Sequence, residues 1–86
     1  MLARTPLRDQ MIAWLERQDP EQHYFYDNPW ECACGQFAHQ IRQFEEWIEM
    51  FDDRSSPWSE LDTIAGRGKP SFGALLHRLK RAKAVP

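Results

Sequence analysis

Seven apolar residues that recur at steps of four and three constrain the fold more than any other feature of the sequence. They are Trp30, Cys34, Phe37, Ile41, Phe44, Ile48 and Phe51. On an α-helix, this spacing places all seven within about 100° of one face. Asn28 before Pro29 is typical of a helix start, and Glu31 completes a capping box. The sequence therefore predicts one continuous helix over residues 29–51, with the stripe buried and the opposite face exposed.

Three further helices are predicted from their capping residues and apolar spacing. The first begins at Thr5-Pro6 and ends at Asp19-Pro20, a short one begins at Ser56-Pro57 and ends at Gly66, and the last begins after Ser71. Serine and threonine cap helix N-termini, proline suits the first helical position, and glycine often follows the last turn. Because each helix is amphipathic, none can bury its apolar face alone. We therefore expect residues 1–86 to form a single all-α domain, a compact bundle of three to four helices around a long central second helix.

Composition excludes several classes of protein. With 42% hydrophobic and 13% aromatic residues, a chain of 86 residues is expected to be globular rather than disordered. No apolar run reaches the length of a membrane span, and the first eight residues lack the apolar stretch of a secretory signal, so we expect a cytoplasmic protein with no membrane contact. Cys32 and Cys34 would point about 200° apart on one helix, which predicts free thiols in a reducing compartment. The sequence sets no oligomeric state.

Thiol chemistry and metal binding are the two kinds of site that the cysteines and histidines raise. A thiol in the first turn of a helix, as predicted for Cys32, has a lowered pKa. His39 lies about 10.5 Å further along the same helix, too far to act as its base, and His23 or His77 would have to arrive by folding. The spacing C-x-C-x4-H from Cys32 through Cys34 to His39 is not a zinc pattern. We therefore predict no catalytic residues, no metal site and no cofactor.

Charge is segregated along the chain, although the net charge is only −2. Residues 1–65 contain all thirteen acids and five arginines, and residues 66–86 contain six basic residues and no acid, so the two parts carry −8 and +6. An acidic group with one aromatic residue falls at the end of the predicted second helix: Glu45, Glu46, Trp47, Glu49, Asp52 and Asp53. Such a group imitates phosphate charge and suits a basic groove on a partner protein, and a partly exposed tryptophan is a good interface anchor. These six residues are the predicted partner-binding residues; the simpler interpretation is an ordinary solvated surface.

The basic C-terminal part supports an alternative hypothesis. A small nucleic-acid-binding regulator would contact phosphates through Arg67, Lys69, Arg78, Lys80, Arg81 and Lys83. The aromatic residues, however, lie on the predicted core stripe and not among the basic residues. Nucleic acid is therefore the less favoured partner.

Two segments of the chain resemble short proteins encoded by phages and prophages. In those proteins a Y-x-Y-x-D stretch precedes C-A-x-x-Q-[FY], and here the similar stretch Tyr24-Phe25-Tyr26-Asp27 precedes Cys32-Ala33-Cys34-Gly35-Gln36-Phe37. The segment from Ser71 to Leu79 is similar to their T-F-G-A-L-x-x-R-L ending, with serine in place of threonine. Residues 38–58 fall outside the resemblance. It implies an origin in a mobile element and a non-enzymatic protein that binds and inhibits a host protein or protein complex, such as an anti-CRISPR protein acting on a nucleic-acid-handling defence complex.

Overall fold

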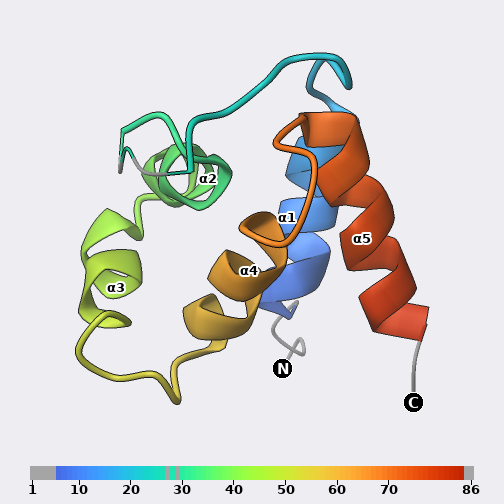
Figure 1. The fold of residues 1–86 in the computed structure, drawn as a ribbon. Coiled ribbons are helices and arrows are strands. Elements are labelled where there is room, and N and C mark those ends of the chain that lie inside the picture. Colours follow the sequence, from blue (N-terminus) through green and yellow to red (C-terminus); the bar gives the residue numbers. More distant parts are fainter. Residues whose placement is uncertain (1–5, 27, 29, 85–86) are drawn as a thin grey trace, which may run out of the picture.

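Five helices form the part of the chain that the structure describes (Figure 1). The structure is a computed structural model, which describes residues 6–26, 28 and 30–84. Residues 83 and 84 are described by their backbone alone. The helices are α1 (Leu7–Glu16), α2 (Ala33–Gln40), α3 (Phe44–Glu49), α4 (Pro57–Ala65) and α5 (Phe72–Ala84). These ranges contain no β-strand, and a single antiparallel bridge joins His23 to Ser71. The predicted all-α class is confirmed.

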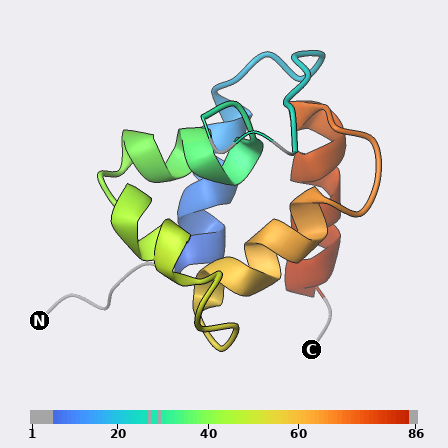
Figure 2. The same ribbon diagram turned by 60° about the vertical axis from the view of Figure 1, so that its left-hand side comes forward.

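Helix α4 lies at the centre of the bundle, because it packs against α1, α2 and α5. Helix α1 also packs against α5, and α3 packs against α2. Figures 1 and 2 show α3 and α5 on opposite sides of the molecule, with α1 and α4 between them. The predicted central position of a long second helix is therefore wrong.

The helix starts that the sequence predicts for the C-terminal half are confirmed. Ser56 caps α4, where its hydroxyl accepts a hydrogen bond from the backbone N–H of Trp58 at 3.2 Å, and α4 ends at Gly66. Ser71 caps α5 in the same way through the N–H of Ala74, at 3.3 Å. In α1, Pro6 stands at the N-cap position and not at the first helical position, and the predicted cap Thr5 lies outside the described residues.

The predicted continuous helix over residues 29–51 is interrupted between α2 and α3. Arg42 adopts a left-handed conformation with φ 60°. The N–H of Arg42 bonds to the carbonyl of His39 at 3.2 Å, and the N–H of Gln43 bonds to that of Ala38 at 2.8 Å. This pair of bonds is a Schellman motif, which ends a helix and is usually built on glycine. Because arginine occupies the left-handed position, the sequence contains no signal for this helix end.

Helix α2 also begins later than predicted. Its N-cap is Cys32, whose sulfur accepts a hydrogen bond from the N–H of Gly35 at 3.2 Å. The predicted cap Asn28 forms a separate turn, in which its side chain accepts from the N–H of Trp30 at 2.8 Å and donates to the Glu31 carboxylate at 3.0 Å. Pro29 lies outside the described residues. The predicted capping residues thus close a turn that precedes the helix.

The core is a cluster of aromatic rings from several helices. Trp14 of α1 contacts Phe37 of α2 and Phe72 of α5, with ring centroids 5.6 and 5.5 Å apart. Phe37 also contacts Trp58 of α4 at 5.6 Å. All four side chains are buried. These rings join α1, α2, α4 and α5 into one hydrophobic core.

The loop over residues 19–26 is held against the start of α5. The N–H of Phe72 donates to the carbonyl of Gln22 at 2.9 Å, and the N–H of Gly73 donates to the carbonyl of Pro20 at 2.8 Å. A Cβ atom on Gly73 would lie 2.8 Å from that same Pro20 oxygen. Glycine is therefore the residue that permits this close approach of loop and helix.

Candidate protein-interaction surface

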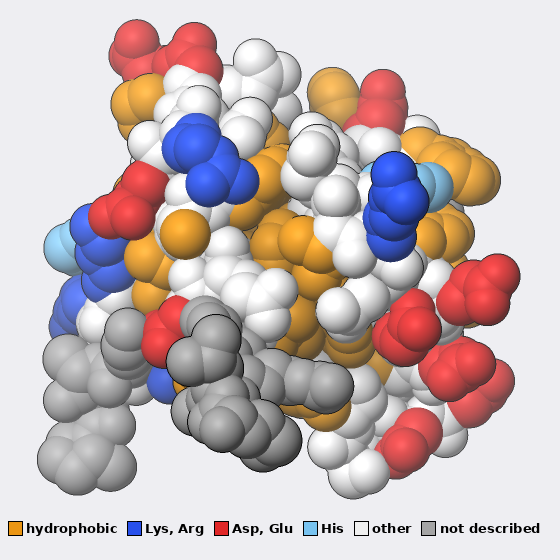
Figure 3. Space-filling view, turned by 180° about the vertical axis from the view of Figure 1, so that it is seen from behind, with side chains coloured by type: hydrophobic (Ala, Val, Ile, Leu, Met, Phe, Trp, Pro, Cys, Tyr) orange, Lys and Arg blue, Asp and Glu red, His pale blue; other side chains and the backbone are white. Residues whose placement is uncertain are grey.

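The predicted acidic residues lie on the surface, on α3 and in the turn after it. Glu45, Glu46, Glu49, Asp52 and Asp53 are all exposed. Among the described residues, the ion pairs are Arg8 with Glu60 and Lys80 with Glu16, so neither involves an acid of α3. Figure 3 shows acidic side chains gathered on the α3 side of the molecule, on the right of that view. The structure therefore leaves a concentrated negative surface facing solvent.

Trp47 does not belong to this exposed surface, so its predicted role as a contact residue is wrong. Its side chain is only 1% exposed and packs between Phe44 and Phe51, at centroid distances of 5.3 and 5.7 Å. The indole N–H forms no hydrogen bond of normal geometry with the described residues, yet it lowers the pKa of Asp62. The break at Arg42 is the physical reason, because it resets the rotation of α3 relative to α2. The buried side of α3 moves by about 100°, from the predicted stripe to Trp47 and Met50.

Both ends of the predicted core stripe lie on the surface instead. Trp30 is 63% exposed, Phe51 54% and Ile48 40%. The Trp30 ring stacks on His39 and on Phe44, both at 4.9 Å, and His39 stacks on Phe44 at 4.0 Å. We call this set of residues the aromatic face: Trp30, His39, Phe44, Ile48 and Phe51. Its stacked rings link the turn before α2 with α2 and α3.

Three members of the aromatic face and three of the acids form two adjacent stripes along α3 and the turn that follows it. Phe44, Ile48 and Phe51 follow the helical steps of four and three. Glu45, Glu49 and Asp52 follow the same steps, one residue later. One residue corresponds to about 100° around a helix. The exposed side of α3 therefore presents an apolar stripe directly beside an acidic stripe.

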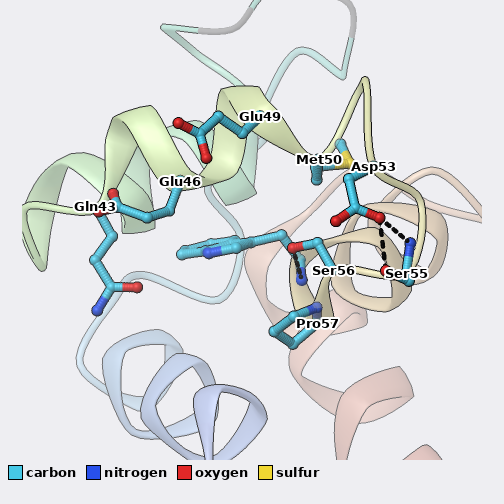
Figure 4. Close-up of a pocket in the computed structure, with 9 residues that line it drawn as sticks. Gln43, Glu46, Glu49, Met50, Asp53, Ser55, Ser56 and Pro57 are labelled. Atoms are coloured by element: carbon cyan, nitrogen blue, oxygen red, sulfur yellow. Dashed lines mark hydrogen bonds between the residues drawn. The ribbon is translucent and has the colours of Figure 1, made fainter.

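An open pocket with a volume of about 470 Å³ lies between α3 and the start of α4 (Figure 4). The carboxylates of Glu46, Glu49 and Asp53 contribute to its lining, and the buried side chains of Met50 and Trp58 contribute apolar surface. Asp53 also accepts hydrogen bonds from the N–H and hydroxyl of Ser55, which lower its pKa. Through Glu46 and Asp53, the pocket extends the negative surface of α3 towards the start of α4.

One carboxylate outside the predicted partner-binding residues is buried. Asp62 of α4 is 7% exposed and accepts a hydrogen bond from the Tyr26 hydroxyl at 3.0 Å. Burial raises the pKa of Asp62, although Tyr26 and the nearby charge of Arg54 lower it. The pKa of Tyr26 rises to about 12, through loss of solvent and its contact with Asp62. Asp62 is thus a structural group beneath the surface, and not part of the exposed acidic stripe.

The predicted nucleic-acid-binding residues are only partly available. Arg78 donates to the backbone carbonyls of Ile64 and Lys69, both at 3.1 Å, and to the hydroxyl of Tyr24 at 3.1 Å. Lys80 pairs with Glu16 at 3.0 Å. The side chain of Lys83 lies outside the described residues, and the remaining three basic residues are exposed: Arg67, Lys69 and Arg81. Arg78 is therefore a structural residue that ties α5 to the end of α4.

The cysteines occupy buried positions. Cys32 is 2% exposed and Cys34 is fully buried. A helix start lowers a thiol pKa, but burial dominates at both residues and raises the pKa of each. The described residues contain no group of three or more His, Cys, Asp or Glu that could hold a metal ion. The thiols behave as small core residues in this structure.

The comparisons with known proteins give no basis for assigning a function, which therefore has to be inferred from the fold and from this surface. No protein-family model, no curated protein and no solved structure matches the chain. Within the described ranges, no helix has both the length and the apolar character needed to cross a membrane.

Proposed function

We propose that this chain is a non-enzymatic protein from a phage or other mobile element that binds and inhibits a host protein. The partner would present a positively charged surface, as nucleic-acid-handling defence complexes do, so the action would resemble that of an anti-CRISPR protein. The chain's likeness to phage-encoded proteins, in the segments around Tyr24 and Ser71, supports the origin. The acidic surface of α3 supports the mode of binding.

The observation that carries the proposal is the set of exposed acids that form no ion pair with the described residues. Glu45, Glu46 and Glu49 lie within two turns of α3, and Asp52 and Asp53 follow directly. Concentrated like charge repels itself within a fold, so it is best compensated by an external partner. A negative surface of this kind steers association with a basic partner and discriminates against acidic ones.

The nucleic-acid hypothesis is the less favoured one because of the contacts of its basic residues. Within the predicted set, Arg78 is bonded within the fold and the exposed Lys80 is paired with Glu16, which leaves Arg67, Lys69 and Arg81 as its exposed, described residues outside such contacts. Affinity for a phosphate backbone grows with the number of phosphates neutralised. Three such cations beside thirteen acids are expected to give weak binding at moderate salt.

The experiment is a plating assay on bacteria that carry defined defence systems, CRISPR systems among them. Expression of the chain should restore plating of a phage that one of the systems restricts. The triple reversal Glu46→Lys, Glu49→Lys, Asp53→Lys should abolish this effect, while Glu21→Lys, which reverses an exposed charge outside α3, should preserve it.

Two results would contradict the proposal. One is full activity of the triple reversal, which would exclude the acidic surface. The other is failure to inhibit any system, together with a gel shift of DNA or RNA whose affinity falls steeply with salt. That second outcome would support the nucleic-acid-binding regulator instead.

A further inference from the structure

We infer that the segment of the partner bound by this surface is a basic amphipathic helix. Its apolar side chains would lie on the aromatic face, and its lysines and arginines would lie on the acidic stripe of α3. This inference rests on the proposed function, because it identifies the kind of partner segment that the same surface recognises. It requires the partner segment to carry an apolar face as well as positive charge.

The pairing of the two stripes carries the inference. Phe44, Ile48 and Phe51 form the apolar stripe, and each is followed in sequence by an acid, so the two stripes run parallel along α3 and into the turn after it. A helical partner has the same periodicity, and its apolar and basic residues can occupy neighbouring faces. Two parallel stripes of opposite character match such a partner along their whole length.

The aromatic face is large enough, and ordered enough, to act as a docking surface. Trp30 and Phe51 are 63% and 54% exposed, which corresponds to roughly 200 Å² of ring surface when a full aromatic side chain buries 150–250 Å². Ile48 and the half-buried Phe44 extend it. Phe44 stacks on Trp30 at an interplanar angle of 13° and on His39 at 27°. Rings fixed by mutual stacking lose little conformational freedom when a partner covers them.

Charge decides between the candidate occupants of the aromatic face. Two copies packed face to face with α3 antiparallel would bring their acidic stripes together, and like charges opposed across an interface repel. With α3 parallel, the acidic stripes would fall on opposite sides of the contact, and neither copy would offer the other a basic stripe. Nucleic acid carries the same sign of charge as Glu45, Glu49 and Asp52 and is repelled for the same reason. A basic amphipathic helix satisfies the apolar stripe and the acidic stripe at once.

The test uses a synthetic helical peptide in place of the unidentified partner. The peptide contains leucine and lysine with helical periodicity over about 18 residues, or five turns. A scrambled peptide of the same composition keeps the charge and removes the apolar face, and a third peptide replaces lysine with glutamate. Isothermal titration calorimetry at near-physiological salt should show binding of the patterned peptide at least about tenfold tighter than the scrambled one.

Matched variants of the chain locate the site. Phe51→Ser removes an exposed ring from the aromatic face and should weaken binding of the patterned peptide about fivefold or more. Phe25→Ser removes a ring that is 64% exposed and makes none of the ring contacts of that face, so it should leave binding unchanged. Circular dichroism verifies that both variants fold. Glu49→Lys should weaken binding of both lysine peptides.

The outcomes separate this inference from the proposed function. Equal binding of the patterned and scrambled peptides would overturn the inference, while recognition by charge, and with it the proposed function, would stand. Absence of binding to either lysine peptide would count against both. Equal losses from Phe51→Ser and Phe25→Ser would refute the assigned face. A dimer in sedimentation velocity that Phe51→Ser dissociates would also overturn the inference, because a second copy would then cover the face.

Discussion

Replacing Arg78 with methionine tests whether this residue stabilises the fold or serves as an exposed phosphate contact. Methionine keeps a long unbranched apolar side chain but removes every hydrogen-bond donor. In the structure the guanidinium of Arg78 donates to Ile64, to Lys69 and to the hydroxyl of Tyr24, and more distantly to the carbonyl of Ala65 at 3.4 Å. Arg78→Met therefore releases the end of α4 from α5.

The expected loss follows from the burial of these contacts. The bonds from Arg78 to Ile64 and to Tyr24 are partly buried, and each is worth about 1.5 kcal/mol at the lower end of the range for charged groups. The bond to Lys69 is exposed and adds little. The free energy of unfolding should thus fall by about 3 kcal/mol. For a domain of this size, about 4–8 °C per kcal/mol gives a drop in Tm of roughly 12–24 °C.

Urea unfolding followed by circular dichroism measures this change. Arg81→Met removes the same charge from an exposed position of α5 and should change stability by less than about 0.5 kcal/mol. Arg78→Lys keeps the charge without the planar fork of donors, so its loss should be intermediate. A stability of Arg78→Met within about 0.5 kcal/mol of the wild type would refute a structural role for this residue.

Three further predictions concern the glycines, the buried carboxylate and the thiols. Gly73→Ala should destabilise the protein by about 1–3 kcal/mol in thermal unfolding, because its new Cβ would clash with the backbone of Pro20. Gly68→Ala should destabilise it less, because its Cβ would lie 3.1 Å from the side chain of Arg78, which can move. Burial raises the pKa of Asp62 above its unfolded value of 3.8, so its contribution to stability is present below that value and is lost as pH rises through the folded pKa. Asp62→Asn should therefore gain stability relative to the wild type as pH rises from about 4, and a constant difference in urea titrations would contradict this. Iodoacetamide should modify Cys32 and Cys34 slowly in the folded protein and rapidly in urea, as measured by mass spectrometry; rapid labelling of the folded protein would contradict their burial.

The C-terminal half of the fold was predictable because its helix boundaries are written in residues with local effects. Ser56-Pro57 starts α4, Gly66 ends it, and Ser71 starts α5. Each works through its own hydrogen bonds or backbone conformation, so a short window of sequence contains the whole signal. Periodicity alone then identifies the buried face of each of these helices.

The region from α2 to α3 was not predictable, because its decisive residue is atypical. The left-handed conformation costs a non-glycine residue about 1–2 kcal/mol, so arginine rarely adopts it. For this reason the sequence around Arg42 does not indicate a helix end. Once the helix is divided there, the apolar spacing across the break no longer describes one face. Trp47 therefore turned inward and Phe51 outward, contrary to the pattern. The exposure of the acids was predicted correctly, because an unpaired charged side chain is costly to bury however the helix is rotated.

The structural role of Arg78 was equally hidden from the sequence. Its neighbours Lys80 and Arg81 look like members of the same basic group. Only the return of the chain after Gly66 brings the carbonyls of α4 within reach of Arg78. A long-range contact of this kind leaves no local pattern.

Helices α3 and α5 lie on opposite sides of the bundle (Figures 1 and 2), so the acids of α3 are separated from the basic residues of α5 although the net charge is small. A charged body nearby exerts a torque on such a molecule and turns it before any contact forms. With a Debye length of about 8 Å at physiological salt, this rotation takes place only in the last few ångströms of approach. A cationic surface that comes within this distance would therefore tend to turn α3 towards itself, so fewer encounters would be lost to wrong orientations.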